Sequence, residues 1–204
     1  MALTATIITS VEALRSIKDE WNALLERADG DTLFMTPAWT LTWLQVSTEP
    51  FDLFTIAVYD DAKLVGLVPF YLASLHILRF KRVRCLRITA DLNTSSEYQD
   101  IVVDRAYEDA AIHLMARTLI EHRHLFSFVW VPFTDVQRGA TDRFEQLFRL
   151  TNLRTRFRPF SFYTAELPRS KAAFDASLSP KQRNNIRRYK KRLAPSSVRL
   201  EDLA

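Results

Sequence analysis

Two mostly apolar stretches joined by a short acidic turn constrain the fold more than any other feature of the chain. Residues 53–59 alternate apolar and polar side chains, residues 63–72 are largely aliphatic, and Asp60 and Asp61 lie between them. Two strand-like stretches with so short a polar connection are typical of a β-hairpin. Antiparallel strand pairing is therefore expected in the first half of the chain.

Helical and strand-like patterns alternate on both sides of this hairpin. Helical spacing of apolar residues follows Thr9 and Glu12, which have capping-box spacing, and begins again at Thr36-Pro37, where a hydroxyl cap precedes a first-turn proline. Further strands are expected over 4–9, 76–89, 98–103, 125–133 and 157–167, and further helices over 107–121, 142–150 and 171–177. This order predicts an α/β fold in which helices flank a mixed sheet, with crossover connections in its later part.

The composition fits a single globular core. Of the 204 residues, 48% are hydrophobic and 12% aromatic, so enough large apolar side chains are present to fill one core. No apolar run approaches the roughly 20 residues that span a bilayer, and the N-terminal stretch lacks the basic start of a signal peptide. The single cysteine, Cys85, excludes an intramolecular disulfide and is expected to be a small buried strand residue. These features predict a cytoplasmic protein.

One basic segment near the C-terminus supplies the positive net charge of the chain. Residues 181–192 hold seven basic side chains and no acidic one, whereas the rest of the chain has a small acidic excess. Ser179, Pro180 and Gln182 have the spacing of a capping box with proline at the first helical position. We therefore expect a basic helix from here to about Ala194, followed by the first residues of a new strand over 198–200.

Three roles are open for this helix. Its narrow apolar stripe could pack on the body and leave the basic side chains in water. Alternatively, Arg183, Arg187 and Arg188 could bind phosphate or carboxylate groups of a substrate, because arginine donates two parallel hydrogen bonds to such groups. Binding to the phosphate backbone of nucleic acid is the third role, although no groove-reading motif favours it further.

Residues that could carry catalysis are few. Tyr98 and Asp100 are two apart in an expected strand and would share one face. Asp100 could act there as a general base on an acceptor hydroxyl or amine, or the two residues could anchor a loop. No metal site is expected, because His122 and His124 have no nearby cysteine to complete a set of ligands. The sequence also lacks the G-x-S-x-G motif of hydrolases.

Four segments, in this order, resemble a known family. The segments are residues 34–39 with Trp43 (FMTPAW…W), 61–69 (DAKLVGLVP), 97–102 (EYQDIV) and 178–188 (LSPKQRNNIRR). They are similar to motifs of the GNAT-type N-acyltransferase domain of the cellulose and exopolysaccharide biosynthesis acetyltransferases, which is distantly related to FemAB-type aminoacyltransferases. The third segment departs from the usual Asp-Tyr-x-Asp pattern of that family at Glu97.

The resemblance implies two GNAT-like lobes with a basic helix between them. In that arrangement residues 1–178 form the N-terminal lobe, and residues 179–204 form the connector helix and the start of a second lobe. An acyl-CoA, such as acetyl-CoA, usually binds the second lobe through a Q/R-x-x-G-x-G/A turn at a helix N-terminus. The present sequence has only Gly30, Gly66 and Gly139, too far apart for that turn. We therefore expect the donor site to lie outside these residues, so that this chain alone binds no coenzyme.

The function implied is acyl transfer to a hydroxyl or amine, in polysaccharide or cell-envelope metabolism. The acceptor would be a small molecule or a glycan, and the missing half would come from a second lobe or from another copy of the chain. GNAT chemistry needs no covalent intermediate, because the enzyme positions donor and acceptor for direct attack and stabilises the oxyanion. A non-catalytic module that binds an acceptor or a partner is the alternative.

Overall fold

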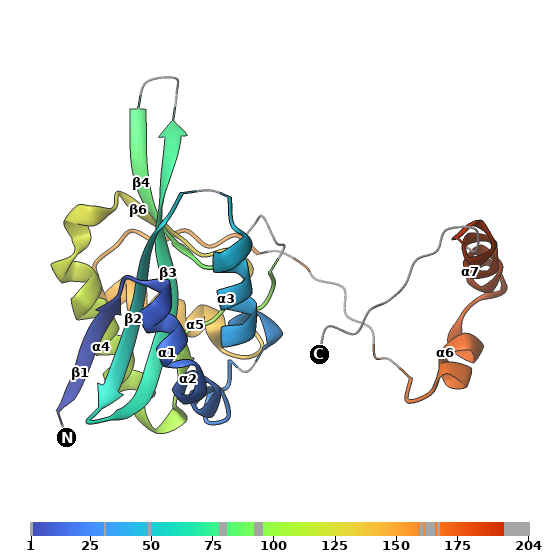
Figure 1. Ribbon diagram of the computed structural model, residues 1–204, viewed down its shortest axis with the longest axis horizontal. Helices are drawn as coiled ribbons and strands as arrows, with labels where there is room; N and C mark the ends of the chain where they lie inside the picture. Colours follow the sequence, from blue (N-terminus) through green and yellow to red (C-terminus); the bar gives the residue numbers. More distant parts are fainter. Residues whose placement is uncertain are drawn as a thin grey trace. The chain divides into compact units, whose positions relative to one another are not determined.

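The computed structural model describes residues 2–30, 32–48, 50–77, 81–91, 96–159, 161, 166 and 168–193. The chain divides into two compact units, Met1–Arg158 and Pro159–Ala204, which are described separately. The first unit is a mixed sheet flanked by helices (Figure 1), so the expected α/β class is confirmed.

The first unit begins with a strand and three helices, and the strands β2, β3 and β4 then follow one another directly. Its strands are β1 (Leu3–Ile8), β2 (Asp52–Asp60), β3 (Lys63–Ile77), β4 (Lys81–Ile88), β5 (Val102–Val103) and β6 (Phe128–Trp130). Its helices are α1 (Val11–Ser16), α2 (Lys18–Leu25), α3 (Pro37–Val46), α4 (Glu108–Glu121) and α5 (Ala140–Leu150), with 3-10 turns at η1 (Leu33–Met35), η3 (Arg105–Tyr107) and η4 (Arg123–Leu125).

The sheet changes from antiparallel to parallel pairing at its last described strand. The order is β1-β2-β3-β4-β6, and β5 pairs with β3 beside this path. Strands β1 to β4 are antiparallel neighbours, whereas β6 runs parallel to β4 through the pairs Cys85↔Phe128 and Arg87↔Trp130. The parallel pair follows from the α4 crossover, because a parallel connection needs a long return segment.

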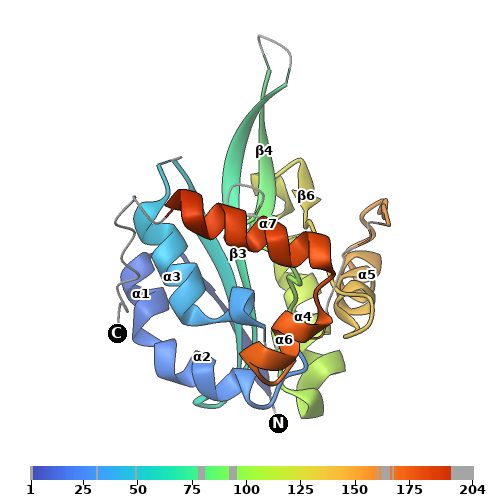
Figure 2. The same cartoon turned by 90° about the vertical axis from the view of Figure 1, so that its right-hand side faces the viewer.

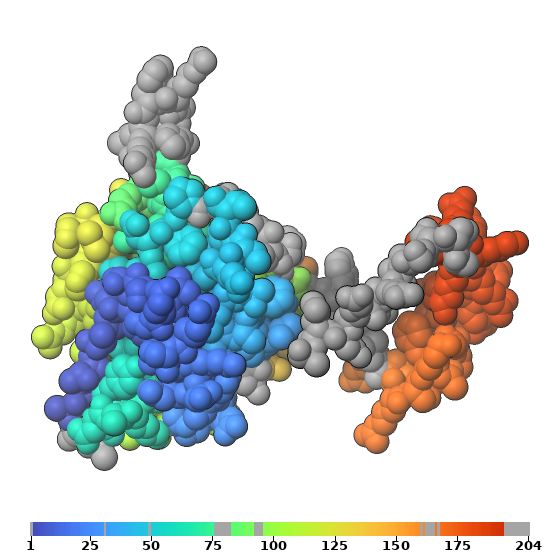
Figure 3. Space-filling model, viewed as in Figure 1, coloured from blue at the N-terminus to red at the C-terminus, as the bar shows by residue number. Residues whose placement is uncertain are grey.

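Helices cover both faces of the sheet. Helices α1, α2 and α3 lie on one side and α4 on the other, with α5 packed against α4 (Figure 2). In the space-filling view, α1, α2 and α3 hide much of the sheet behind them (Figure 3). Because strand side chains alternate between faces, Phe54 of β2 meets His122 after α4, whereas Tyr71 of β3 meets Trp43 of α3. Burial on both faces explains why β2 and β3 are almost continuously apolar.

One glycine allows α4 to lie close to the sheet. A Cβ on Gly66 of β3 would stand 2.9 Å from Met115 Cε and 3.3 Å from Ala111 Cβ. Both residues are fully buried on the face of α4 that meets the sheet. The close approach therefore needs a residue without a side chain at this position.

Most of the expected helices are confirmed, with one difference at the first. Thr36 caps α3 by accepting a hydrogen bond from the Trp39 N–H at 3.2 Å, as its position before proline indicated. The first helix is capped by Ser10, whose side chain accepts from Ala13 N–H, so the expected cap at Thr9 is wrong. The helix also breaks at Ile17 into α1 and α2.

Two of the expected strands are wrong in extent. Strand β3 continues to Ile77 and pairs back onto β4 through Ile77↔Lys81, so residues 76–89 belong to two strands. Both strands carry the same alternation of side chains, and periodicity alone did not locate the reversal. The strand expected over 125–133 covers only β6, Phe128–Trp130, which lies at the end of the sheet order with Trp130 43% exposed. The strand expected over 157–167 falls partly outside the described residues, and the described ones form none.

The second unit contains α6 (Lys171–Ser177) and α7 (Pro180–Leu193). The capping box predicted for α7 is confirmed, because Gln182 N–H donates to Ser179 Oγ at 3.3 Å and Ser179 N–H donates to Gln182 Oε1 at 2.8 Å. The strand start expected over 198–200 lies outside the described residues. No helix in the described part of the chain is long and apolar enough to cross a membrane.

Candidate functional site

Two of the segments singled out by the resemblance contact each other directly, although they are about sixty residues apart in sequence. Trp39 Nε1–H donates to Ser96 Oγ at 2.9 Å, and the Asp100 N–H donates to Met35 Sδ at 3.4 Å. The Thr32 hydroxyl also donates a hydrogen bond from Oγ1 to the Tyr98 carbonyl at 3.4 Å. The turn η1 and helix α3 thus hold the loop around residues 96–100 in place.

Another of these segments, residues 61–69 of the β2–β3 hairpin, contacts the end of the same loop. Strand β5 pairs with β3 through Gly66↔Val103 and Leu67↔Val102. The Asp104 N–H then donates to the Val65 carbonyl at 2.9 Å. Residues 34–39 and 61–69 therefore both contact one loop, residues 96–104, which contains the segment 97–102 and which we call the convergence loop.

The convergence loop occupies the place where the parallel strands β4 and β6 diverge. The Gln99 N–H donates to the Phe133 carbonyl at 3.1 Å, and Gln99 pairs with Thr134 in a parallel bridge. On its other side the side-chain amide of Gln99 donates from Nε2 to the carbonyls of Thr89 and Ala90, just after β4. The carboxyl ends of parallel strands are a common ligand position in α/β sheets. Here Gln99 fills that position itself, through its main chain on the β6 side and its side-chain amide on the β4 side.

A buried ion pair anchors the convergence loop to α5. Arg143 Nε donates to Asp100 Oδ1 at 2.9 Å and its Nη2 donates to Oδ2 at 2.5 Å, with side chains only 6% and 2% exposed. Burial raises the pKa of the Asp100 carboxyl, and the hydrogen bonds and charge of Arg143 oppose that shift. Although burial lowers the pKa of Arg143, Asp100 raises it above its ordinary value. This pairing matches the loop-anchoring role considered for Asp100.

The strand expected over 98–103 is wrong except at its end. Strand β5 covers only Val102–Val103, and Tyr98 has a left-handed backbone with φ of +54°. Asp100 uses its own carboxylate to accept the Ile101 N–H at 2.7 Å. Both features belong to an irregular loop, so Tyr98 and Asp100 do not share the face of a strand.

A second buried polar cluster lies beside the loop at the end of β4. The guanidinium of Arg87 forms an ion pair with Asp91 and lies over the rings of Tyr71 and Trp130, at 5.8 and 5.7 Å from their centres. Arg87 is 7% exposed and Asp91 is 1% exposed. The rings and the carboxylate together compensate the buried positive charge.

The N-terminus of α4 is acidic. Asp104 Oδ1 accepts the Ala106 N–H at 3.1 Å, and Glu108 and Asp109 occupy the first helical turn. Asp104 Oδ2 also binds Arg27 Nε at 2.8 Å and Lys63 Nζ at 2.9 Å. Although burial raises the pKa of Asp104, these hydrogen bonds lower it below its ordinary value. The two carboxylates in the first turn of α4, Glu108 and Asp109, make this helix end unfavourable for phosphate.

The three predicted anion-binding arginines all lie on α7 in the second unit. Arg187 and Arg188 are exposed, and Arg188 lies over the Tyr189 ring at 5.2 Å from its centre. Arg183 is half-buried and donates from Nη1 to the Asp175 carbonyl at 3.1 Å. Within this unit the apolar stripe remains open, since Tyr189 is 52% exposed and Leu193 is 59% exposed.

Three further side chains could carry chemistry, namely Cys85, His122 and His124. Cys85 is fully buried, and burial raises the pKa of its thiol to about 12, so the expectation of a small buried strand residue is confirmed. His122 and His124 stack at 6.4 Å between ring centres. Among the described residues no three His, Cys, Asp or Glu side chains gather as metal ligands.

Sequence analysis missed Arg87, Gln99 and Arg143. Arg143 could have been recognised from the sequence, because its helical spacing places it beside Phe144 on the face that also holds Ala140 and Leu147. A charged residue on an apolar helix face indicates a buried partner. Gln99 and Arg87 gave no such signal, since their partners depend on where β4 and β6 diverge.

Comparison with known proteins finds fold likeness at low identity. No protein-family model and no curated protein matches the chain. Among solved structures, an aminoglycoside acetyltransferase from an uncultured soil metagenomic sample, in complex with sisomicin, is 16% identical with a TM-score of 0.48, over 81% of this chain and 97% of that one. A ribosomal-protein-alanine N-acetyltransferase from Brucella melitensis biovar Abortus 2308 is 14% identical with a TM-score of 0.43, over 82% and 100%. A GNAT family acetyltransferase from Staphylococcus aureus is 13% identical with a TM-score of 0.40, over 82% and 100%. The function of this chain is therefore inferred from its own residues.

Proposed function

We propose that this chain is the acceptor-binding lobe of an acyl-CoA-dependent N- or O-acyltransferase. The observation that carries the proposal is that residues 34–39 and 61–69 both contact the convergence loop, which contains residues 97–102. These are three of the four segments by which the chain resembles GNAT-type acyltransferases. Residues of one functional site must lie close together, and these segments meet that condition.

The acyl donor, in this proposal, binds a second lobe or a second subunit. Two observations support this division. The chain has only three widely spaced glycines, and the first turn of α4 carries two carboxylates, Glu108 and Asp109. Coenzyme diphosphate needs a helix end with free N–H groups and no carboxylates.

Basic side chains of α7 would then neutralise an anionic group at the junction with the donor. Arg183, Arg187 and Arg188 are the proposed anion-binding residues, with no acidic residue on the helix to compete. The acceptor would be a small molecule or a glycan of polysaccharide or cell-envelope metabolism, bound through its hydroxyl or amine groups. Direct attack of that group on the thioester would need positioning and oxyanion stabilisation and no covalent intermediate.

The two catalytic candidates have different roles in this proposal. Asp100 is committed to Arg143 and the Ile101 N–H, so it positions the convergence loop. The half-buried Tyr98 lies on the same loop and is the candidate for direct contact with an acceptor. A Tyr98→Phe variant that raises the KM for the acceptor, with an unchanged melting temperature, would support this assignment.

Titration calorimetry of the chain with acetyl-CoA and with a panel of amino sugars and hydroxyl-bearing oligosaccharides tests the division. We expect an acceptor to bind and acetyl-CoA to give no heat. Micromolar binding of acetyl-CoA by this chain alone would overturn the proposal.

Transfer of radiolabelled acetyl groups by the enzyme that contains the lobe should fall in R187Q/R188Q and persist in the matched control K190Q/K191Q. Absence of any transfer would favour the non-catalytic binding module.

A further inference from the structure

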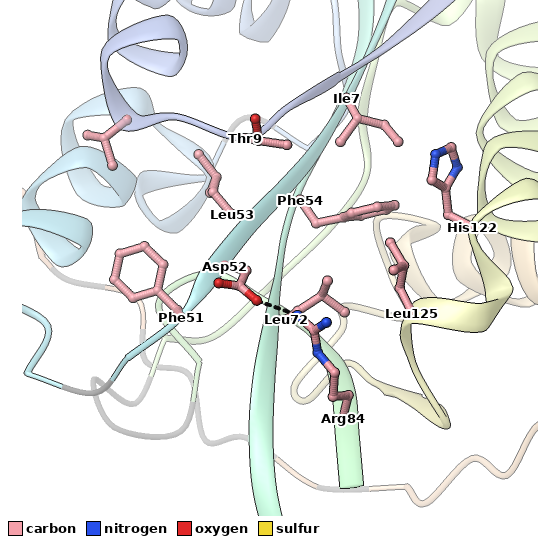
Figure 4. Close-up of a pocket in the computed structure, with 11 residues that line it drawn as sticks. Ile7, Thr9, Phe51, Asp52, Leu53, Phe54, Leu72, Arg84, His122 and Leu125 are labelled. Carbon is pink, nitrogen blue, oxygen red and sulfur yellow. Dashed lines mark hydrogen bonds and ion pairs between the residues drawn. The ribbon is translucent and has the colours of Figure 1, made fainter.

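A groove of about 570 Å³ opens at the edge of the sheet where β1 ends and β2 begins (Figure 4). It lies between that edge, the middle of β4 and the C-terminal end of α4, and it contains no residue of the convergence loop. Its volume falls within the range of roughly 300–1,000 Å³ that small-molecule sites occupy. The groove is therefore large enough for a small organic ligand, and it is independent of the function proposed above.

The floor of the groove is apolar. Phe54 of β2 and Leu72 of β3 are buried there; Leu72 lies two residues beyond Phe70, the partner of Phe54, and so on the same face of the sheet. The partly buried Ile7 and Leu125 stand at the sides of the groove. Figure 4 shows the Phe54 ring in the middle of these side chains. A ligand lying here would bury apolar surface of its own against them, which is a source of affinity.

One end of the groove carries an incompletely used arginine. Arg84 Nη2 binds Asp52 Oδ2, and this is the only hydrogen bond of the Arg84 guanidinium within the described residues. The guanidinium has five N–H donors in a planar fork that matches a carboxylate. Asp52 is 72% exposed and Arg84 40% exposed, so Asp52 can turn to water at little cost while Arg84 keeps its place beside the apolar floor.

The opposite side of the groove offers a hydrogen-bond acceptor. His122 Nδ1 lies 2.9 Å from the Thr118 carbonyl, and because a carbonyl only accepts, Nδ1 carries the proton. In this tautomer Nε2 is the ring nitrogen that can accept a hydrogen bond, on the side away from the Thr118 carbonyl. The edge-to-face contact with Phe54, at 5.7 Å between ring centres, holds the ring at the groove.

We propose that this groove binds a small amphipathic carboxylate. The ligand carboxylate takes the unused donors of Arg84, its apolar body covers Phe54, Leu72 and Leu125, and a hydroxyl at its far end donates to His122 Nε2. An amine would instead pair with Asp52 and leave the Arg84 donors unused. The unused donors of Arg84 and the exposure of Asp52 favour the carboxylate.

The proposal is tested with three probes that differ only in their head group: 4-phenylbutyrate, 4-phenylbutyramide and 4-phenylbutylamine. Binding to the full chain is followed by NMR chemical-shift titration. We expect the carboxylate to bind most tightly, with the largest shifts at residues of the groove. Equal affinity for the carboxylate and the amide, preference for the amine, or shifts confined to other regions would each overturn the proposal.

Two charge variants give opposite predictions and identify the group that binds. R84Q should weaken carboxylate binding by about tenfold or more, because a charge-assisted pair is lost. D52N should strengthen it by several-fold, because Arg84 loses its competitor. The matched control is R117Q, which removes an exposed ion pair with Glu121 outside the groove and should leave the affinity unchanged. L125Q should weaken all three probes alike. If D52N weakened carboxylate binding, or R84Q did not, Arg84 would not be the binding group.

Discussion

Substitution of Arg143 should lower the free energy of unfolding more than any single substitution of an exposed residue on α5. The structure gives Arg143 two hydrogen bonds to Asp100, a third to the Arg138 carbonyl at 2.6 Å and a longer contact with Glu108. Arg143→Met would leave the Asp100 carboxylate buried, 2% exposed, with the Ile101 N–H as its remaining hydrogen-bond donor among the described residues. Breaking a buried pair in this way costs about 3–5 kcal/mol of the free energy of unfolding. In a chain of this size the melting temperature should fall by roughly 6–20 °C.

Urea unfolding followed by tryptophan fluorescence measures this loss. The matched control is Arg149→Met on the exposed side of the same helix, which should change the free energy of unfolding by no more than about 0.5 kcal/mol. Because Arg143 and Asp100 bind each other, the double variant with Asp100→Asn should cost less than the sum of the two single changes by about 1–3 kcal/mol. If R143M and R149M were equally stable, or the two changes were additive, Asp100 and Arg143 would not form a buried pair in solution.

Three further predictions concern Cys85, Asp104 and Gly30. Burial raises the pKa of Cys85 to about 12, so the native protein should resist the thiol reagent DTNB at pH 8 and react fully in urea; rapid reaction without denaturant would contradict this. The pKa of Asp104 is lowered in the fold, so its stabilisation is fully present above the ordinary aspartate pKa of about 3.9 and is lost as pH falls through the folded-state value. Asp104→Asn should therefore lower the urea midpoint at pH 6, and the difference in midpoint from wild type should shrink as the pH falls below 4. A difference in midpoint that did not change with pH would exclude this linkage. A Cβ on Gly30 would stand 2.8 Å from Asp100 Oδ2, so Gly30→Ala should cost about 1–3 kcal/mol in the same urea assay, and a neutral effect would mean that Asp100 can move.

Sequence reasoning was most successful where the structure is governed by near neighbours. The cap at Thr36 and the capping box of Ser179 and Gln182 are formed by residues three apart, and both were predicted. The β2–β3 hairpin was predicted for the same reason, because its turn lies within four residues of both strands. Failures came at chain reversals without a turn signal, such as the one between β3 and β4, and in the loop at Tyr98, where a left-handed residue interrupts an apparently extended pattern.

Part of the candidate site could be predicted and part could not. The segments that form it were identified from sequence, and Asp100 was recognised as a residue with either a chemical or an anchoring role. Its partner Arg143 is 43 residues away, on a helix that reaches it only after the α4 crossover and β6. No local pattern links the two residues, so sequence analysis could not choose between the roles.

Local pattern was enough to predict the α/β class, the hairpin, the helix caps and the basic character of α7, because these depend on side-chain periodicity and on hydrogen bonds between close neighbours. The folded chain was needed to show that residues 34–39, 61–69 and 97–102 meet, that Arg143 neutralises Asp100, and that Arg84 and His122 face one groove. These contacts join residues that are distant along the chain. Strand order and register bring them together, and both are chosen by burial of the whole core.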